Sequence, residues 1–170
     1  MMLETERLLV RPFRMEDAAE LQAILGDPET MAFVEPPYDM ARTEAFLREF
    51  CIGRGGAMAA ALRPEGPVIG YLLFHAVEPD VYEMGWIFHR GYWRQGYACE
   101  ACAALMRHAF EELGAHRVFA ETVDPVRSAG LMRKLGMRPE GVQREAVRDR
   151  QGHWQDMYLY GLLEREYASR

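Results

Sequence analysis

Hydrophobic and polar residues follow two regular patterns along this chain. Strict alternation is typical of half-buried strands, and apolar residues that recur every three or four positions indicate a helix with one buried face. The two patterns together predict a mixed α/β chain. Helices are expected at residues 15–25, 41–50, 95–113 and 128–135. Strands are expected at residues 8–13, 57–62, 68–77, 81–88, 117–123, 137–148 and 154–163.

Short turn signals between these elements predict how the strands are connected. Pro64-Glu65-Gly66 and Pro79-Asp80 separate the three strands of residues 57–88, and links this short favour antiparallel neighbours. Residues 149–153 are expected to turn the last two strands into a hairpin. Gly114 lies where a glycine commonly ends a helix. No linker of domain-boundary quality occurs, so we expect one domain over residues 1–170.

Composition and charge narrow the class of protein. The chain has 170 residues, of which 49% are hydrophobic and 27% charged, and its net charge is −6. An acidic chain is unlike a generic nucleic-acid binder, which usually carries a basic domain. Three cysteines cannot form a paired disulfide framework, and we find no secretory leader and no apolar run of the roughly 18 residues that a membrane span needs. A cytoplasmic protein without nucleic-acid or membrane partners is therefore expected.

The junction between the strand of residues 81–88 and the long helix carries the clearest chemistry. The first turn of a helix presents unpaired N–H groups and the positive end of the helix dipole, so a diphosphate can bind there. Gly96 removes a side chain where phosphate would approach the backbone, Ala98 keeps the next turn small, and Arg94 adds a positive charge. The alternative is an ordinary helix start with a packing glycine. Neither a P-loop nor a dinucleotide-binding fingerprint occurs.

Two runs at this junction resemble the acetyl-CoA site of the GNAT N-acetyltransferases, although Trp93 occupies the Arg/Gln slot of that family's motif. They are Glu83-Met84-Gly85-Trp86-Ile87-Phe88 and Tyr92-Trp93-Arg94-Gln95-Gly96-Tyr97-Ala98-Cys99-Glu100-Ala101. Three further pieces, in the family's order, are similar to the branch typified by the ribosomal-protein N-terminal acetyltransferases. They are Thr5-Glu6-Arg7-Leu8 with Arg11-Pro12, Lys134-Leu135-Gly136-Met137, and Gly152-His153-Trp154-Gln155-Asp156-Met157-Tyr158.

This resemblance implies a fold and an activity. The fold is a mixed, mostly antiparallel seven-stranded sheet with helices on both faces and a V-shaped opening in its middle. The activity is transfer of acetyl from acetyl-CoA to a primary amine in a ternary complex, without a metal, and a homodimer is possible in this family. The implied cofactor-binding residues are Ile87 and Phe88, whose backbone would polarise the carbonyl, and Arg94, Gln95, Gly96, Tyr97 and Ala98 around the diphosphate.

The chemistry also requires a base for the amine and, optionally, an acid for the departing thiolate. Glu83 is our first choice as the base because it lies in an otherwise apolar strand, with Glu121 in reserve. The alternative is that Glu83 simply faces solvent. Many GNAT enzymes use a tyrosine as the acid, but the helix of residues 128–135 contains none, so Ser128 is the candidate. Ser128 is equally suited to be the N-cap of that helix. The family's usual asparagine is also missing from residues 124–128.

Several questions stay open in the sequence. A non-catalytic acyl-CoA-binding sensor or partner module is the rival function, and a larger acyl-CoA is a possible donor. The acceptor, either a protein N-terminus or a small amine, is expected to meet residues 28–40 and 149–153, with Tyr38 and Trp154 as possible lining residues. Cys99 and Cys102 share a helix face, but no second pair exists to complete a zinc site.

Overall fold

A computed structural model describes residues 1–169 and contains an eight-stranded sheet with the order β1-β2-β3-β4-β5-β6-β8-β7. Neighbouring strands are antiparallel except β5 and β6, which are parallel. The strands are β1 (Leu3–Glu4), β2 (Leu8–Pro12), β3 (Ala57–Leu62), β4 (Val68–Glu78), β5 (Val81–Phe88), β6 (Arg117–Thr122), β7 (Arg138–Arg148) and β8 (Trp154–Leu163). The seven expected strands are present. The eighth, β1, is too short for a periodic pattern to reveal it.

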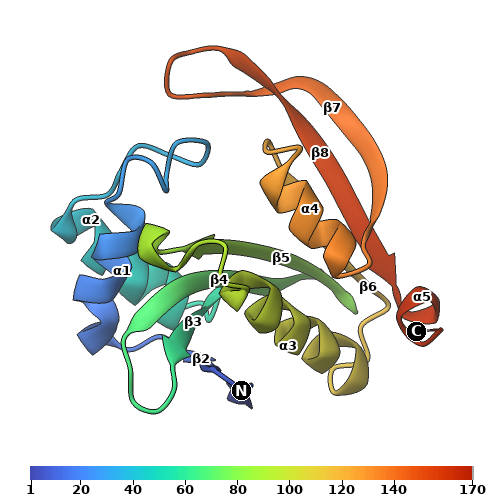
Figure 1. The fold of residues 1–170 in the computed structure, drawn as a ribbon, viewed down its shortest axis with the longest axis horizontal. Helices are drawn as coiled ribbons and strands as arrows, with labels where there is room; N and C mark the ends of the chain where they lie inside the picture. Colours follow the sequence, from blue (N-terminus) through green and yellow to red (C-terminus); the bar gives the residue numbers. More distant parts are fainter. Residues whose placement is uncertain (170) are drawn as a thin grey trace.

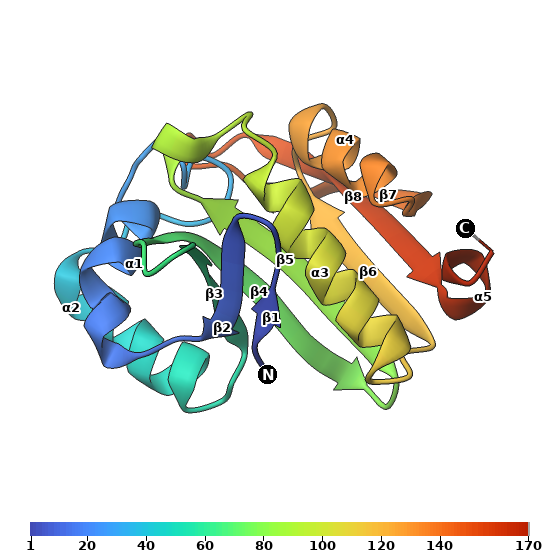
Figure 2. The same ribbon diagram turned by 60° about the horizontal axis from the view of Figure 1, so that its bottom comes forward.

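Helices cover both faces of the sheet. They are α1 (Ala18–Leu25), α2 (Met40–Phe46), α3 (Tyr97–Glu111), α4 (Arg127–Lys134) and α5 (Glu164–Tyr167). A 3₁₀ turn at Met15–Asp17 leads into α1, and a second lies at Arg90–Tyr92. The expected helix of residues 41–50 begins one residue earlier, because the Asp39 side chain caps it, and continues as a π-helical segment, Leu47–Ile52. Figure 2 shows α3 lying across one face of the sheet beside α4.

Two hydrophobic cores form on opposite faces of the sheet. On one face, Leu72 and Met84 pack with residues of α3 such as Leu105. On the other face, α1 and the π-helical segment pack Leu21 and Leu47 against the sheet. Strand β3 is buried on both sides, and its run of alanines leaves room for both layers. The two cores together fix the position of β5, which lies between them.

The sheet opens in its middle, between β5 and β6. These strands pair only where Val81–Glu83 lies beside Arg117–Phe119. Strand β6 continues to pair with β8 as far as Thr122 and Tyr158, so it diverges from the second half of β5. The V-shaped opening expected from the family resemblance is therefore present.

The β7–β8 hairpin arches over one end of the molecule (Figure 1). Its turn reaches the loop between α1 and α2, where the Arg150 side chain donates a hydrogen bond to the Pro28 carbonyl at 3.0 Å. The two segments expected on the acceptor side are thus in contact. No helix of residues 1–169 combines the length and apolarity needed to cross a bilayer.

Candidate active site

The first turn of α3 begins at a backbone conformation that only glycine adopts easily. Gly96 has a φ of +86°, and the preceding Arg94 has a φ of +60°. The Glu100 amide is bonded to the Gly96 carbonyl at 3.0 Å. The amides of the three residues from Tyr97 onward precede that bond and have no carbonyl of the helix to pair with. A bare backbone with free N–H groups and a nearby arginine fits a diphosphate.

Side-chain hydrogen bonds hold the loop before α3 in shape. The Trp93 indole donates to the Phe88 carbonyl at 2.7 Å, which folds the loop back onto the end of β5. The Gln95 side chain donates to the Gly91 carbonyl at 3.0 Å, and Arg7 donates to the Gln95 carbonyl at 2.9 Å. Hydrogen bonds within the loop, and one from Arg7 just before β2, therefore fix the shape of the loop.

Glu100 anchors the N-terminal segment to α3. Its carboxylate accepts hydrogen bonds from the Thr5 hydroxyl at 2.6 Å and from the Arg7 amide at 2.8 Å, and it pairs with the Arg7 guanidinium at 2.6 Å. Burial acts to raise the pKa of Glu100, but the hydrogen bonds from Thr5 and Arg7 outweigh it and hold that pKa below its ordinary value. The guanidinium also lies 4.3 Å from the centre of the Tyr97 ring. The sequence analysis did not predict this network, although the Thr5-Glu6-Arg7-Leu8 motif contains two of its members, Thr5 and Arg7.

The backbone amides of β5 alternate between its two neighbours. The His89 amide donates to the Ile69 carbonyl of the β4 side at 2.9 Å. Since opposing residues of an antiparallel pair alternate between bonded and non-bonded pairs, the Ile87 amide also faces β4. The amides of Trp86 and Phe88 consequently face the opening. Of the two positions expected around the reacting carbonyl, Phe88 has a free donor, whereas Ile87 contributes its side chain to the opposite core.

Glu83 lies on β5 at the point where the opening begins. Its Oε2 is 3.1 Å from Nε2 of His75 on β4, and its side chain is 29% exposed. Ile87 lies four residues further along β5, so its side chain is on the same face of the strand as that of Glu83. Glu121 lies on β6, on the other side of the opening, and lines the same cavity. The carboxylates of both base candidates therefore reach one space.

That space is a cavity of about 330 Å³ lined mainly by aromatic and apolar side chains. The aromatic ones are Tyr38, Phe46, Phe50, Tyr71 and Trp86. The Tyr38 hydroxyl donates to Glu35 at 2.9 Å, and burial, followed by this hydrogen bond, raises the pKa of Tyr38. Tyr38 lines the cavity as proposed from the sequence. Trp154 does not: it is 50% exposed and lies under the guanidinium of Arg148.

Ser128 is not the N-cap of its helix. Helix α4 begins at Arg127, and the carboxylate of Asp124 accepts hydrogen bonds from the Val126 amide at 3.0 Å and the Arg127 amide at 2.9 Å. Asp124 thus performs the capping that serine was expected to provide. Burial acts to raise the pKa of Asp124, but these hydrogen bonds outweigh burial and hold the pKa below its ordinary value. Ser128 lies in the first turn of α4, half-buried.

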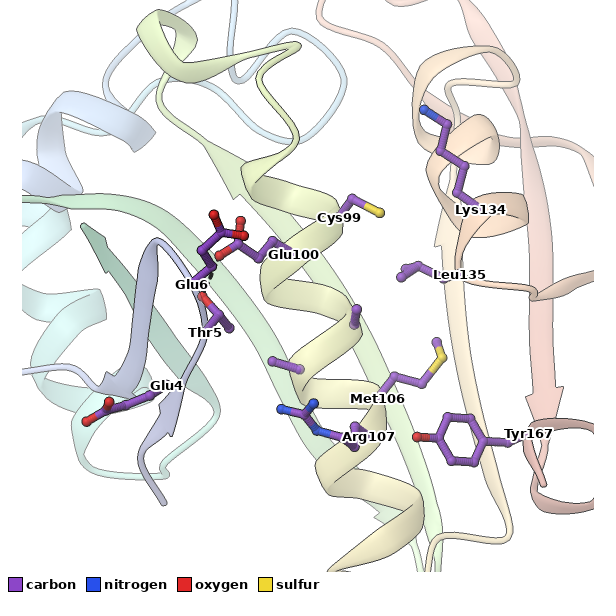
Figure 3. A pocket seen from close by; sticks show the side chains of 12 residues that line it. Glu4, Thr5, Glu6, Cys99, Glu100, Met106, Arg107, Lys134, Leu135 and Tyr167 are labelled. Carbon is purple, nitrogen blue, oxygen red and sulfur yellow. Dashed lines mark hydrogen bonds between the residues drawn. The ribbon is translucent and has the colours of Figure 1, made fainter. Parts of the chain in front are cut away.

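A larger hollow of about 650 Å³ follows the outer face of α3 and lies outside the opening (Figure 3). Figure 3 shows Cys99 and Met106 pointing to its α4 side, while Thr5 and Glu100 lie on the opposite flank. Cys102 is fully buried, and burial raises the pKa of its thiol. Within residues 1–169, no cluster of three or more His, Cys, Asp or Glu side chains is arranged to hold a metal ion.

The structure thus places a helix N-terminus beside an opened sheet and beside a cavity that is lined in part by carboxylates. The chain belongs to the acetyltransferase (GNAT) domain family, whose model matches residues 7–138. It is an acyltransferase of the N-acetyltransferase type. YnaD, an uncharacterized N-acetyltransferase of Bacillus subtilis (strain 168), is 31% identical over 171 residues, which cover 98% of this chain and 99% of that protein.

Solved structures show the same fold. An acetyltransferase (GNAT family) from Bacillus anthracis is 29% identical and has a TM-score of 0.90, covering 98% of this chain and 100% of its own. The ribosomal L7/L12 alpha-N-protein acetyltransferase RimL, solved in complex with coenzyme A, has a TM-score of 0.83 at 19% identity, with 96% and 98% of the chains covered. At that identity the likeness concerns the fold.

Proposed function

We propose that the chain acts as one domain over residues 1–170 and transfers acetyl from acetyl-CoA to a primary amine by direct attack in a ternary complex. The opening of the sheet after the third residue of β5 carries this proposal, because it brings a free strand edge, a helix N-terminus and a carboxylate-lined cavity together. The acceptor is a protein N-terminus, as for the RimL neighbour, or a small amine. Three free cysteines fit a cytoplasmic enzyme, and the β7–β8 hairpin offers a surface for a homodimer.

The first turn of α3 is the proposed holding site for the diphosphate. Gly96 keeps the backbone bare, and the amides of Tyr97 and Ala98 point away from the helix with no carbonyl to meet. Arg94 and Gln95 flank this turn and are exposed. The pantetheine arm would then follow the unpaired edge of β5.

The chemistry then needs one proton acceptor and one hydrogen-bond donor on β5. Glu83, directly or through water, takes a proton from the ammonium, and the freed amine forms a C–N bond with the thioester carbonyl. The negative charge that develops on the carbonyl oxygen is stabilised by the Phe88 amide. Collapse of the intermediate breaks the C–S bond, and the second proton of the nitrogen passes to the thiolate, directly or through the Ser128 hydroxyl, or to solvent.

Replacement of the base tests the chemistry apart from cofactor binding. We expect Glu83→Gln to lower kcat by about 10²-fold or more, since general bases contribute at least that much. The Kd for acetyl-CoA should change less than about twofold, because Glu83 faces the acceptor cavity and not α3. Thiol release with a panel of amines measures the first quantity, and calorimetry measures the second.

Glu112→Gln is the matched control, because this exposed residue at the end of α3 lies far from the opening. An unchanged kcat in Glu83→Gln would remove Glu83 as the base. Acetyl-CoA binding without turnover of any amine in the wild-type protein would instead favour the acyl-CoA-binding module.

A further inference from the structure

The acceptor cavity has a chemically uneven lining. Its volume of about 330 Å³ lies at the low end of the roughly 300–1,000 Å³ of small-ligand sites. The rings of Tyr38 and Phe46 meet edge to face at 5.6 Å, and Phe46 stacks on Phe50 at 5.2 Å. These rings form a continuous wall opposite β5. A wall of this kind buries an apolar group of an acceptor, and its one hydroxyl, that of Tyr38, is already bonded to Glu35.

Every charged side chain that lines the cavity is a carboxylate. They are Glu35, Glu83 and Glu121. Arg42 neutralises Glu35, because it pairs with that residue at 2.5 Å and stacks over the Tyr38 ring. Within residues 1–169, the side chain of Glu121 has no hydrogen bond or ion pair. The two remaining carboxylates, Glu83, which lies 3.1 Å from His75 Nε2, and Glu121, line the cavity at the opening.

The parallel register explains why two carboxylates meet there. Glu83 lies beside Phe119, so Glu121 is two residues further along β6, on the same face of the sheet. The strands diverge beyond this point, and the two carboxylates stand on opposite sides of the opening. Such a pair attracts an ammonium group and repels a carboxylate attached near it.

From this lining we propose that the acceptor is a primary amine that carries an aromatic or bulky apolar group and no carboxylate beside the amine. This rests on the proposed function and names the acceptor class for the same site. Glu121 is a specificity-determining residue in this proposal, while Glu83 remains the base. A small arylalkyl amine and a polypeptide with an apolar first residue share this chemistry.

Matched amines test the proposal on the wild-type enzyme. 2-Phenylethylamine and phenylalanine differ by one carboxylate, so their ratio of kcat/KM, expressed per unprotonated amine, reports the repulsion. We expect 2-phenylethylamine to be favoured by about 10²-fold. It should also exceed ethylamine by at least about 10-fold, because the ring buries apolar area. Equal use of phenylalanine, or of ethylamine, would overturn the proposal.

Peptides separate the two sources of the amine. A kcat/KM for a peptide that begins with phenylalanine above the value for 2-phenylethylamine assigns the cavity to polypeptide ends. The reverse result assigns it to small amines, and both results support the shared chemistry. Equal acetylation of peptides that begin with phenylalanine and with serine contradicts it.

Substitution at Glu121 tests the charge directly. We expect Glu121→Lys to raise the kcat/KM for phenylalanine relative to 2-phenylethylamine by at least about 10-fold, and Glu121→Gln to raise it by a smaller factor. Glu112→Lys is the control and should leave the ratio unchanged. Loss of turnover with both amines in Glu121→Gln would make Glu121 catalytic and overturn its assigned role. No thiol release with any amine in the wild-type enzyme would refute the proposed function itself, whereas release without selectivity refutes only this inference.

Discussion

At the scale of single residues, Gly96 determines how closely a ligand approaches the start of α3. Its backbone has a φ of +86°, where an L side chain is strained, and a Cβ there would lie 3.3 Å from Nη2 of Arg7. The same backbone geometry occurs at Gly114, at the other end of the helix, where a Cβ would meet nothing within 4 Å. The two glycines therefore share a backbone requirement, and only Gly96 lies at the proposed diphosphate site.

We expect Gly96→Ala to weaken acetyl-CoA binding by about 10-fold or more. The added methyl group both strains the backbone, by roughly 1–2 kcal/mol, and presses on the guanidinium that holds the loop. Calorimetry with acetyl-CoA measures the change. Gly114→Ala carries the same backbone strain, so it should lower Tm similarly and leave the Kd unchanged. Equal Kd values for the two variants would argue against the placement of the diphosphate at Gly96.

Glu100 makes a second prediction at this scale, through its lowered pKa. A carboxylate with a lowered pKa stabilises the folded state fully above its unfolded value of 4.5, and this contribution is lost as the pH falls through the folded pKa. Glu100→Gln should therefore lower Tm at neutral pH by roughly 2–4 °C, the shift that corresponds to about 1 kcal/mol in a domain of this size.

The difference in Tm between wild type and Glu100→Gln should narrow as the pH falls below about 4.5. Thermal unfolding at a series of pH values measures it, with Glu112→Gln as the exposed control. A difference that persists undiminished at pH values of about 2–3 would show that the charge of Glu100 is not what matters.

At the scale of elements, β5 differs along its two edges. One edge pairs with β4 along the whole strand, while the other loses β6 after Glu83. Helix α3 begins just beyond the end of the strand and is tied to it through Trp93. A single strand therefore carries the candidate base, Glu83, and the Phe88 amide proposed to bond the thioester carbonyl. It also leads into the loop before α3.

Hydrogen exchange of β5 amides tests this division. Without ligand, the amides of Trp86 and Phe88 should exchange faster than that of Ile87, because only Ile87 lies in the β4 ladder. Saturation with acetyl-CoA should slow Phe88 more than Ile87. NMR exchange rates measure both. Equal protection of the three amides in the free protein would contradict the assigned direction of the strand's donors.

The sequence was a good guide to elements and a poorer one to their ends. Period-two alternation located seven strands, three of them at their observed bounds, 57–62, 81–88 and 154–163. It missed β1 and α5, which span two and four residues and have no room for a period. Ser128 was misplaced as a possible N-cap because Asp124 and Ser128 are both good caps, and only the backbone path decides between them.

At the scale of the whole molecule, three segments that are distant in sequence meet on the proposed acceptor side. Arg90, in the turn after β5, pairs with Glu29 at 2.6 Å and lies 3.5 Å from Asp27. Arg150, in the β7–β8 turn, bonds to the Pro28 carbonyl. The loop between α1 and α2 is thus held from both the cofactor side and the hairpin side.

Arg90→Ala should raise the KM for the amine by about 3–10-fold while Tm changes little, since exposed ion pairs contribute little to stability. The same variant should leave the Kd for acetyl-CoA within about twofold. Steady-state kinetics and calorimetry measure these quantities. A larger effect on acetyl-CoA than on the amine would mean that Arg90 serves the cofactor loop and not the acceptor loop.

The candidate site was predictable only where its parts are close in sequence. The loop and helix start around Gly96 could be read from the chain because they are consecutive residues. The Arg7–Glu100 pair is separated by 93 positions and required the fold. The shared face of Glu83 and Glu121, and the aromatic wall opposite them, likewise depend on strand register and helix packing, which local patterns do not contain.

The incomplete pairing of β5 has a consequence for stability if acetyl-CoA binds at its free edge as proposed. A ligand that binds only the folded state stabilises it by mass action, by about 2.7 kcal/mol when its free concentration is 100 times its Kd. If acetyl-CoA completes the sheet there, a cell rich in that thioester would keep more of the protein folded and protected from proteases. The unpaired edge of β5 would then make the amount of folded enzyme depend on the supply of acetyl-CoA.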